Sequence, residues 1–527
     1  MSEQHTQDGH AAASARPPLD HRLRRMVGRD PDEPHRASTP LELLFDLTFV
    51  VAFSQAGAQT AHLLELGHWG PAIGGFLFAV FAIWWAWINY SWLASAYDND
   101  DIFFRVATMV EMLGVLVLAL GLPALFHSLD EGEHVDNGVV VAGYVVMRVA
   151  TIALWLRAAK HDTARRRTAL TYAGMVSVIQ LGWIVLIFVN LPLAPTLAFT
   201  SLLIIAELVG PYVAEHGRGG GTPWHAHHIA ERYGLLVIIT LGEIILGTIL
   251  AISAVIDEQG WSPEAIAVAF GGTALAFGLW WVYFTMPSGK VLARFRERGF
   301  TWGYLHYFIF VALAGTGAGL HVAAFEIEGV AHIGLVQAIL TVVVPVGLFM
   351  VALFTIYSLL LKQFDPFHVW LFVGSIVMLV LAVVAVAAGA TFGVGILITA
   401  VAPFVVVVGF ETVGHRHQAA ALQRARRLRR GGGCRGIRDT THRTVADAGC
   451  DPASEPSRRT PKRADDKGGG CRGIRPLRVG RSAGYAFGRF ARSTSRRARY
   501  SVSSMSPLAK RSASVDSALA PRAHGGP

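Results

Sequence analysis

The chain has 527 residues, of which 53% are hydrophobic and only 16% are charged, and its mean hydropathy is +0.43. A soluble core of this size does not need so much apolar sequence, which excludes an ordinary soluble protein and indicates an integral membrane protein. The net charge of +9 could suit a nucleic-acid partner. Because the basic residues gather in loops and tails, membrane topology and anionic lipid headgroups explain them. We therefore predict the lipid bilayer as a partner, and no nucleic acid.

The chain begins with a polar stretch that is rich in Arg, His and Pro and has no cleavable signal pattern. This composition predicts a disordered leader over residues 1–40. Apolar runs follow, most of them close to the roughly 20 residues that cross the hydrocarbon of a bilayer. The sequence thus predicts an all-α polytopic membrane bundle of about twelve transmembrane helices, at 41–63, 71–93, 103–125, 138–157, 168–190, 195–213, 232–253, 264–286, 302–323, 332–360, 369–389 and 391–412.

Basic residues occupy only every second loop between these runs. The loop after the first run and each alternate loop that follows it contain no Lys or Arg. The opposite set of loops contains, among others, Arg157, Lys160, Lys290, Arg294 and Lys362. By the positive-inside rule, this pattern predicts a multi-pass protein of the cell (plasma) membrane with both termini in the cytoplasm.

Two features suggest an internal duplication. Glu42 and Glu231 each stand at the start of the first helix of a half, and paired tryptophans stand in the second helix of each half, at 84–85 and 280–281. We predict two parallel six-helix repeats, 41–214 and 215–413, related by an axis along the membrane normal. The alternative is that paired tryptophans simply mark the membrane interface.

The C-terminal region, 414–527, is rich in Gly, Arg and Ser and contains the octamer GGGCRGIR twice. It also holds all three cysteines, so the membrane body can form no intramolecular disulfide. No CxxC pair or aromatic interleaving supports a metal-binding or RNA-binding tail. We predict a disordered basic cytoplasmic tail.

Ionisable residues inside the predicted spans are the main candidates for a functional site. Each costs about 2.5–3.5 kcal/mol to insert, so each needs a partner or a hydrated cavity. We expect them to face the interior of the bundle and to line one polar cavity that opens toward the cytoplasm. The residues are Glu42, Asp46, Glu111, Arg148, Glu207, Arg232, Glu243 and His306.

Some of these residues have spacings that suggest a role. Glu42 and Asp46 are one helical turn apart, and two neighbouring carboxylates favour a proton or a small cation. Alternatively, they cap the helix after Thr39 and pair with loop arginines. Arg148 sits in the middle of its span, and we expect Glu111 or Glu243 as its partner. Arg232 and Glu243 are too far apart to touch, so each requires a partner on another helix.

The cluster most like a metal site comprises His225, His228 and Glu231. Each neighbouring pair is three residues apart, so the three side chains could converge on a metal ion from one helical face. The alternative is a solvated helix start that needs polar residues.

Four stretches resemble the bacterial low temperature requirement A family over about residues 40 to 413. The first is ELLFDLTFVVAFSQ at 42–55, and the second runs from Trp84 to EMLGVLVLALGLP at 111–123. The third is HIAERYGLLVIITLGEIILG at 228–247, and the fourth combines WWVYF at 280–284 with YLHYFIFVALAGTGAGLH at 304–321. The chain departs from the family pattern at Thr285, where members often have an acidic residue. The resemblance implies a multi-pass membrane protein, and the family's name, which records a growth phenotype, suggests a stress response.

Together, these features favour a cation-linked or proton-linked transporter or channel, because transporters combine many spans with carboxylates that face inward. A membrane-embedded enzyme that uses the intramembrane acids or the histidine cluster is one alternative. A non-catalytic component of the cell envelope that acts in stress is another.

Overall fold

The computed structural model describes residues 23–34, 36–189, 191–362, 365–420 and 423. These residues contain twelve helices that are long and apolar enough to cross a membrane, and they contain no strand. The predicted all-α membrane bundle is therefore confirmed. Most of the predicted tail, with both copies of the octamer and with Cys434, Cys450 and Cys471, lies outside the described residues. The chain divides into the units 1–443 and 444–527, and all described residues belong to the first.

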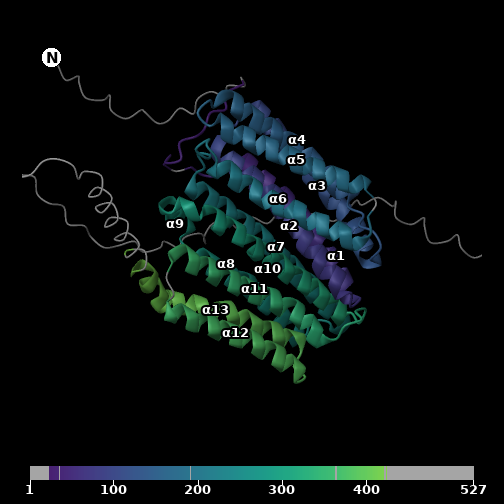
Figure 1. The fold of residues 1–527 in the computed structure, drawn as a ribbon. Helices are drawn as coiled ribbons and strands as arrows, with labels where there is room; N and C mark the ends of the chain where they lie inside the picture. Colours follow the sequence, from purple (N-terminus) through teal and green to yellow (C-terminus); the bar gives the residue numbers. More distant parts are fainter. Residues whose placement is uncertain (1–22, 35, 190, 363–364, 421–422, 424–527) are drawn as a thin grey trace, which may run out of the picture. The chain divides into compact units, whose positions relative to one another are not determined.

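The helices coincide with the predicted spans to within a few residues (Figure 1). A short helix, α9, precedes α10, and a break of only a few residues separates α12 from α13. The bounds are α1 Pro40–Glu65, α2 Trp69–Tyr97, α3 Ile102–Glu131, α4 Gly138–His161, α5 Arg166–Phe188, α6 Leu193–His216, α7 Ala226–Gln259, α8 Pro263–Phe284, α9 Ser288–Arg294, α10 Gly299–Ile327, α11 Leu335–Leu361, α12 Pro366–Ala387 and α13 Phe392–Gly409.

Polar caps fix where α1 and α7 begin. The hydroxyl of Thr39 accepts a hydrogen bond from the backbone N–H of Glu42 at 3.2 Å, and the Glu42 carboxylate accepts from the backbone N–H of Thr39 at 2.8 Å. This reciprocal pair is a capping box. At α7, the Nδ1 atom of His225 accepts from the backbone N–H of His228 at 3.1 Å. Both helices therefore begin with polar side chains held in a defined geometry.

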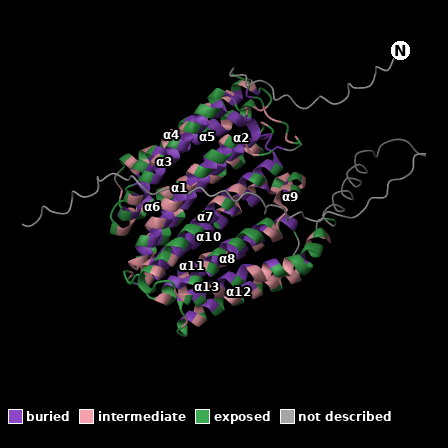
Figure 2. Ribbon diagram, turned by 180° about the vertical axis from the view of Figure 1, so that it is seen from behind, coloured by how far each residue is buried: buried purple, intermediate pink, exposed green. Residues whose placement is uncertain are grey.

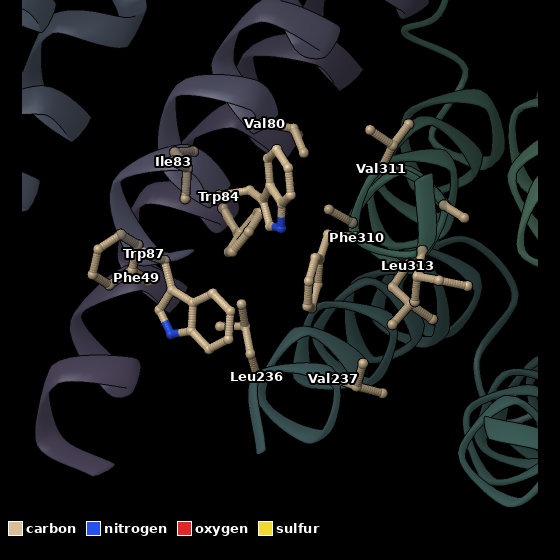
Figure 3. Packing of buried hydrophobic residues seen from close by; sticks show 14 of the residues in the cluster. Phe49, Val80, Ile83, Trp84, Trp87, Leu236, Val237, Phe310, Val311 and Leu313 are labelled. Carbon is tan, nitrogen blue, oxygen red and sulfur yellow. The ribbon is translucent and has the colours of Figure 1, made fainter. Parts of the chain in front are cut away.

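The centre of the bundle is formed by α2 and α10. In their most apolar stretches, 72% and 89% of the residues are buried, compared with 22% in α12. Buried residues accordingly face neighbouring helices, while α12 presents mostly exposed and intermediate residues (Figure 2). Figure 3 shows Trp84 and Trp87 of α2 packed with Phe310 of α10 and Leu236 of α7. Close approach of α10 to α7 depends on Gly317, because a Cβ there would lie 2.8 Å from the Cβ of Glu243.

The helices pack in a similar order in the two halves of the chain. In the first half, α1 packs against α2 and α3, and the contacts continue from α3 through α4 and α5 to α6. In the second half, α7 packs against α8 and α10, and the contacts continue from α10 through α11 and α12 to α13. The described residues differ between the halves in one respect, since α13 also packs extensively against α8, whereas α6 has no comparable contact with α2. The halves meet where α1 and α2 lie against α7 and α10.

Part of the predicted leader has a defined structure. Residues 1–22 and 35 lie outside the described residues, but the remainder of 23–39 crosses the ends of α2, α3, α4 and α7. Met26 is fully buried. The Arg36 guanidinium donates to the carbonyl oxygens of Ser95 at 2.7 Å and Ala94 at 2.8 Å. A cation at the C-terminal end of α2 also interacts favourably with the helix dipole.

Candidate functional site

A network of four buried ionisable side chains lies between α1 and α7. Glu42 and Asp46 come from α1, His228 and Arg232 come from α7, and all four are 0% exposed. Arg232 Nη1 lies 3.0 Å from Glu42 Oε1, and Arg232 Nη2 donates to Asp46 Oδ1 at 2.5 Å. His228 Nε2 lies 3.1 Å from Glu42 Oε1. Each helix contributes two residues one turn apart, so the acidic pair of α1 meets the basic pair of α7 in register.

Aromatic side chains of α2 enclose this network. The indole N–H of Trp87 donates to Asp46 Oδ1 at 2.6 Å. The Arg232 guanidinium lies 5.7 Å from the centre of the Trp87 ring and 5.9 Å from that of Tyr90, within the range of cation–π attraction. Among the described residues, Asp46 Oδ2 and His228 Nδ1 have no hydrogen-bond partner. The network therefore retains a free acceptor and a free imidazole nitrogen.

The charges of the network do not balance. With His228 neutral, two carboxylates face one guanidinium, which leaves one negative charge in a fully buried site. Just outside it, Arg36 and Asp98 add one charge of each sign. Burial lowers the pKa of Arg36 to about 10, so it stays protonated at neutral pH. An unbalanced buried charge is costly, and the arrangement therefore favours uptake of one proton or one small cation.

A second buried group connects α4, α6 and α2. Arg148 Nη2 lies 3.0 Å from Glu207 Oε2, and the indole N–H of Trp85 donates to the same oxygen at 2.7 Å. This pair contains one charge of each sign. Glu111 lies nearby on α3 and accepts a hydrogen bond from the Thr151 hydroxyl at 2.9 Å. The ion-pair partner of Arg148 is thus Glu207, which differs from the two partners that the sequence suggested.

Two further candidates lie apart from both groups. Glu243 of α7 interacts with Ser54 of α1. His306 is buried among aromatic rings, with its Nε2 atom 3.1 Å from the Tyr283 hydroxyl and its Nδ1 atom 2.7 Å from the carbonyl oxygen of Trp302. The contacts in the described part of the chain thus separate the eight candidates into two groups and two single residues, rather than bringing them to one cavity.

The three suggested metal ligands do not converge. His225 caps α7, and its Nε2 atom lies 2.8 Å from the carbonyl oxygen of Glu33. His228 contacts Glu42, and Glu231 accepts a hydrogen bond from the backbone N–H of Ser38 at 3.1 Å. Within the ranges that the structure describes, no group of three His, Cys, Asp or Glu side chains could hold a metal ion.

The tryptophans of α2 donate hydrogen bonds to buried carboxylates, which was not predicted from the sequence. Trp85 and Trp87 donate to Glu207 and Asp46, and the Trp92 indole donates to Glu215 at 2.9 Å. A buried indole N–H usually finds an acceptor, so several tryptophans in one apolar span were an available signal, although the indole N–H of Trp84 in the same helix has no partner among the described residues. The one-turn spacing of His228 and Arg232 was a second available signal.

Comparison with known proteins places these groups within a family. The family model of the bacterial low temperature requirement A protein (LtrA) matches residues 37–407, from just before α1 into α13. The chain belongs to the bacterial low temperature requirement A family. Both buried groups of this LtrA protein lie in the matched region, and the resemblance predicted from the four sequence stretches is confirmed.

The chain is also similar to an uncharacterized protein from Rhizobium meliloti (strain 1021). The two chains are 29% identical over 257 residues, which cover 47% of this LtrA protein and 58% of the relative. The match therefore spans little more than half of the relative's length.

Proposed function

We propose that this LtrA protein performs proton-linked or cation-linked transport across the membrane, with Asp46 as the group that binds and releases the proton or cation. The observation that carries the proposal is that the fully buried network of Glu42, Asp46, His228 and Arg232 sets two carboxylates against one guanidinium, so that one negative charge is in surplus when His228 is neutral.

Asp46 suits this role better than Glu42. Glu42 Oε1 forms no hydrogen bond but lies within ion-pair distance of both Arg232 and His228, and Oε2 accepts from the backbone N–H of Thr39. Asp46 keeps Oδ1 for Trp87 and Arg232, while Oδ2 has no partner among the described residues. A proton on Oδ2 would neutralise the network and weaken the attraction between α1 and α7. Proton binding would in this way change a contact between the two halves of the chain.

The proposed orientation of the protein in the membrane rests on the distribution of basic residues. We propose that both termini lie in the cytoplasm and that the protein resides in the cell membrane. The network then lies toward the cytoplasmic ends of α1 and α7. A groove between the segment 31–36 and the start of α7, lined by Asp32, Glu33 and His225, lies on that side, and none of the four network residues lines it.

The experiment uses purified full-length protein in liposomes that contain a pH-sensitive dye. A sodium or potassium gradient is imposed, and the internal pH is followed for wild type, Asp46→Asn and Asp257→Asn. Asp257 is an exposed residue near the C-terminal end of α7 and serves as the matched control. We expect gradient-driven pH changes with wild type and with Asp257→Asn, and none with Asp46→Asn. Absence of any change with wild type, or normal change with Asp46→Asn, would contradict the proposal.

A further inference from the structure

Glu243 is a buried carboxyl group that the proposed mechanism does not use. It is 4% exposed, and it lies near the middle of α7, roughly 25 Å along the helix from each end. In the described part of the chain, its side chain interacts with the Ser54 hydroxyl of α1, and no charged group acts on it. Glu42, Asp46 and Glu207 differ from it, because each of them faces a guanidinium.

The helices around Glu243 supply no counter-charge among the described residues. α10 brings Gly317 against Glu243, and it brings the titratable ring of His321 against Gly247, one turn further along α7. α8 meets α7 near Thr248 and adds no charged group. An ionised carboxylate at the middle of a membrane needs a cation or water. Without a cation, Glu243 is neutral and holds a proton unless water reaches it.

An apolar layer separates Glu243 from the network between α1 and α7. Glu243 lies eleven residues, or about three turns, beyond Arg232 on α7. The positions between the two sites include Phe49 of α1 and Leu236 of α7, which belong to one apolar cluster with Phe310 of α10 (Figure 3). All three of these side chains are fully buried. A proton on Glu243 therefore needs a route other than the network.

One side of α1 changes from apolar to polar beside this carboxyl group. Residues three or four positions apart share one side of a helix, and on this side they are Leu44, Leu47, Val51, Gln55, Gln59, His62 and Glu65. The first three are 51%, 57% and 51% exposed, as expected for side chains that contact lipid. The other four are polar, and the change occurs next to Ser54, the partner of Glu243.

The two glutamines lie at membrane depth without partners. Gln55 and Gln59 are half-buried, and their amide groups form no hydrogen bond within the ranges that the structure describes. An amide that faces hydrocarbon without a partner is costly, so lipid does not suit this part of α1. Water does, because each amide can both donate and accept. At the outer end, His62 Nδ1 lies 2.7 Å from Glu65 Oε1, and the polar side thus continues to the membrane surface.

We propose that Glu243 is a second proton-binding site, and that water along Gln55 and Gln59 connects it to the outer side of the membrane. This inference rests on the proposed transport and orientation. Asp46 would then exchange protons with the cytoplasm, and Glu243 would exchange them with the outside. The apolar layer between the two sites would prevent a continuous leak of protons.

The first test measures whether water reaches the polar part of α1. Gln59→Cys and Val51→Cys are made in full-length protein in which serine replaces the three native cysteines. Intact cells are treated with a charged, impermeant methanethiosulfonate, which reacts with a thiolate and therefore requires water. Val51 is the matched control, because it lies on the same side of α1 and is 51% exposed.

We expect Gln59→Cys to react at least tenfold faster than Val51→Cys. If Gln59→Cys reacts as slowly as the control, lipid or a second copy of the chain covers the glutamines, and the proposal is wrong. The labelling rate does not depend on transport. A failure of the liposome experiment therefore leaves this result unaffected, and the two proposals can fail separately.

The second test asks whether Glu243 holds a proton at pH 7. Dicyclohexylcarbodiimide dissolves in the membrane and adds to protonated carboxyl groups. The carboxyl proton moves to one nitrogen of the reagent, and the carboxyl oxygen bonds to its central carbon. The adduct rearranges to a stable acylurea that keeps every atom of both reactants, and mass spectrometry of the peptides locates the added mass.

Glu207 is the matched control for this reaction. Glu207 and Glu243 are both 4% exposed, but Glu207 is paired with Arg148 at 3.0 Å. We expect the adduct on Glu243 and not on Glu207, and Glu243→Gln should remove it from its peptide. An unmodified Glu243, or equal modification of the two residues, would overturn the assignment of the second proton site.

Discussion

Single buried carboxylates in this protein have different roles because their partners differ. Glu207 faces one guanidinium and one indole, and its charge is balanced by Arg148. Asp46 shares Arg232 with Glu42, and the single positive charge of the guanidinium therefore faces two carboxylates. The first arrangement links helices, and the second is the one at which we propose that a proton or cation binds.

Removal of Arg148 should destabilise the protein without a specific effect on proton binding. Arg148→Ala leaves Glu207 buried and unpaired, which costs about 3–5 kcal/mol. The free energy of unfolding in detergent measures this loss. Arg105→Ala is the control, since Arg105 pairs with Asp100 on the surface, where both side chains are 46% exposed, and an exposed pair contributes about 0–1 kcal/mol. Similar losses in the two variants would contradict the role assigned to Arg148.

Asp98, just beyond the end of α2, should make stability depend on pH. Burial, and then the negative charge of Glu42, raise its pKa from 3.8 to about 6. A raised pKa means that the folded state binds the proton more tightly than the unfolded state, so this stabilisation is complete below pH 3.8 and is lost as pH rises through 6. Asp98→Asn has no carboxyl at this position, so the variant does not lose this stabilisation as the pH rises. Relative to wild type, the variant should gain on the order of 2–3 kcal/mol between pH 4 and pH 7.

Asp101 provides the control for this measurement. Burial would raise its pKa, but hydrogen bonds from Arg157 and from backbone N–H groups lower it to about 2. Asp101 is therefore ionised throughout the range from pH 4 to pH 7. Asp101→Asn should change the free energy of unfolding by nearly the same amount at both pH values, with a difference of about 0.3 kcal/mol because only the unfolded state takes up some proton at pH 4. If Asp98→Asn behaves in the same way, the carboxyl of Asp98 does not titrate in this range.

At the level of helices, the sequence predicted the spans but not their neighbours. Each span follows from local hydropathy and from caps such as Thr39, which depend on adjacent residues only. The pairing of α1 with α7 joins Asp46 to Arg232 across 186 positions, and no local spacing encodes such a contact. The acidic and basic one-turn pairs were both visible in the sequence, and only the fold shows that they face each other.

The segment 23–39 is an element that hydropathy could not reveal, because it is polar and has no periodic pattern. Its attachment should depend on Arg36, which donates two hydrogen bonds to the end of α2. Hydrogen bonds from a charged donor contribute about 1.5–3 kcal/mol. Arg36→Gln should therefore increase the fraction of molecules in which the segment 23–39 is detached from the helix ends, roughly tenfold to hundredfold. Trypsin cleavage after Arg25, next to the buried Met26, reports this opening.

Lys290→Gln is the control for this experiment, because Lys290 is an exposed residue of α9. Its cleavage rate after Arg25 should match that of wild type. If Arg36→Gln is cleaved no faster than the control, other contacts hold the segment in place.

For the whole molecule, we propose that the two halves are copies of one six-helix unit. The shared order of helix contacts supports this proposal, since α1 to α6 have their counterparts in α7, α8 and α10 to α13. An even number of spans gives both copies the same orientation in the membrane. The first helices of the two copies, α1 and α7, then form the contact that carries the ion network.

The proposed orientation can be measured by labelling single cysteines in intact cells. In a background where the native cysteines are replaced by serine, Glu258→Cys should react with an impermeant thiol reagent and Lys290→Cys should not. Both positions are exposed, and they lie beyond opposite ends of α8. Labelling of Lys290→Cys alone would reverse the orientation. The residues replaced in the background are Cys434, Cys450 and Cys471.

The hydrogen bonds of α2 have an optical consequence. Trp85, Trp87 and Trp92 each donate an indole N–H to a carboxylate on another helix. The ultraviolet absorption and emission of an indole respond to the charge of its hydrogen-bond acceptor, and a proton on Asp46 would remove the charge that Trp87 senses. The protein thus contains its own chromophore, Trp87, at the site where its buried charge would change, and the absorption of α2 would follow that change without an added label.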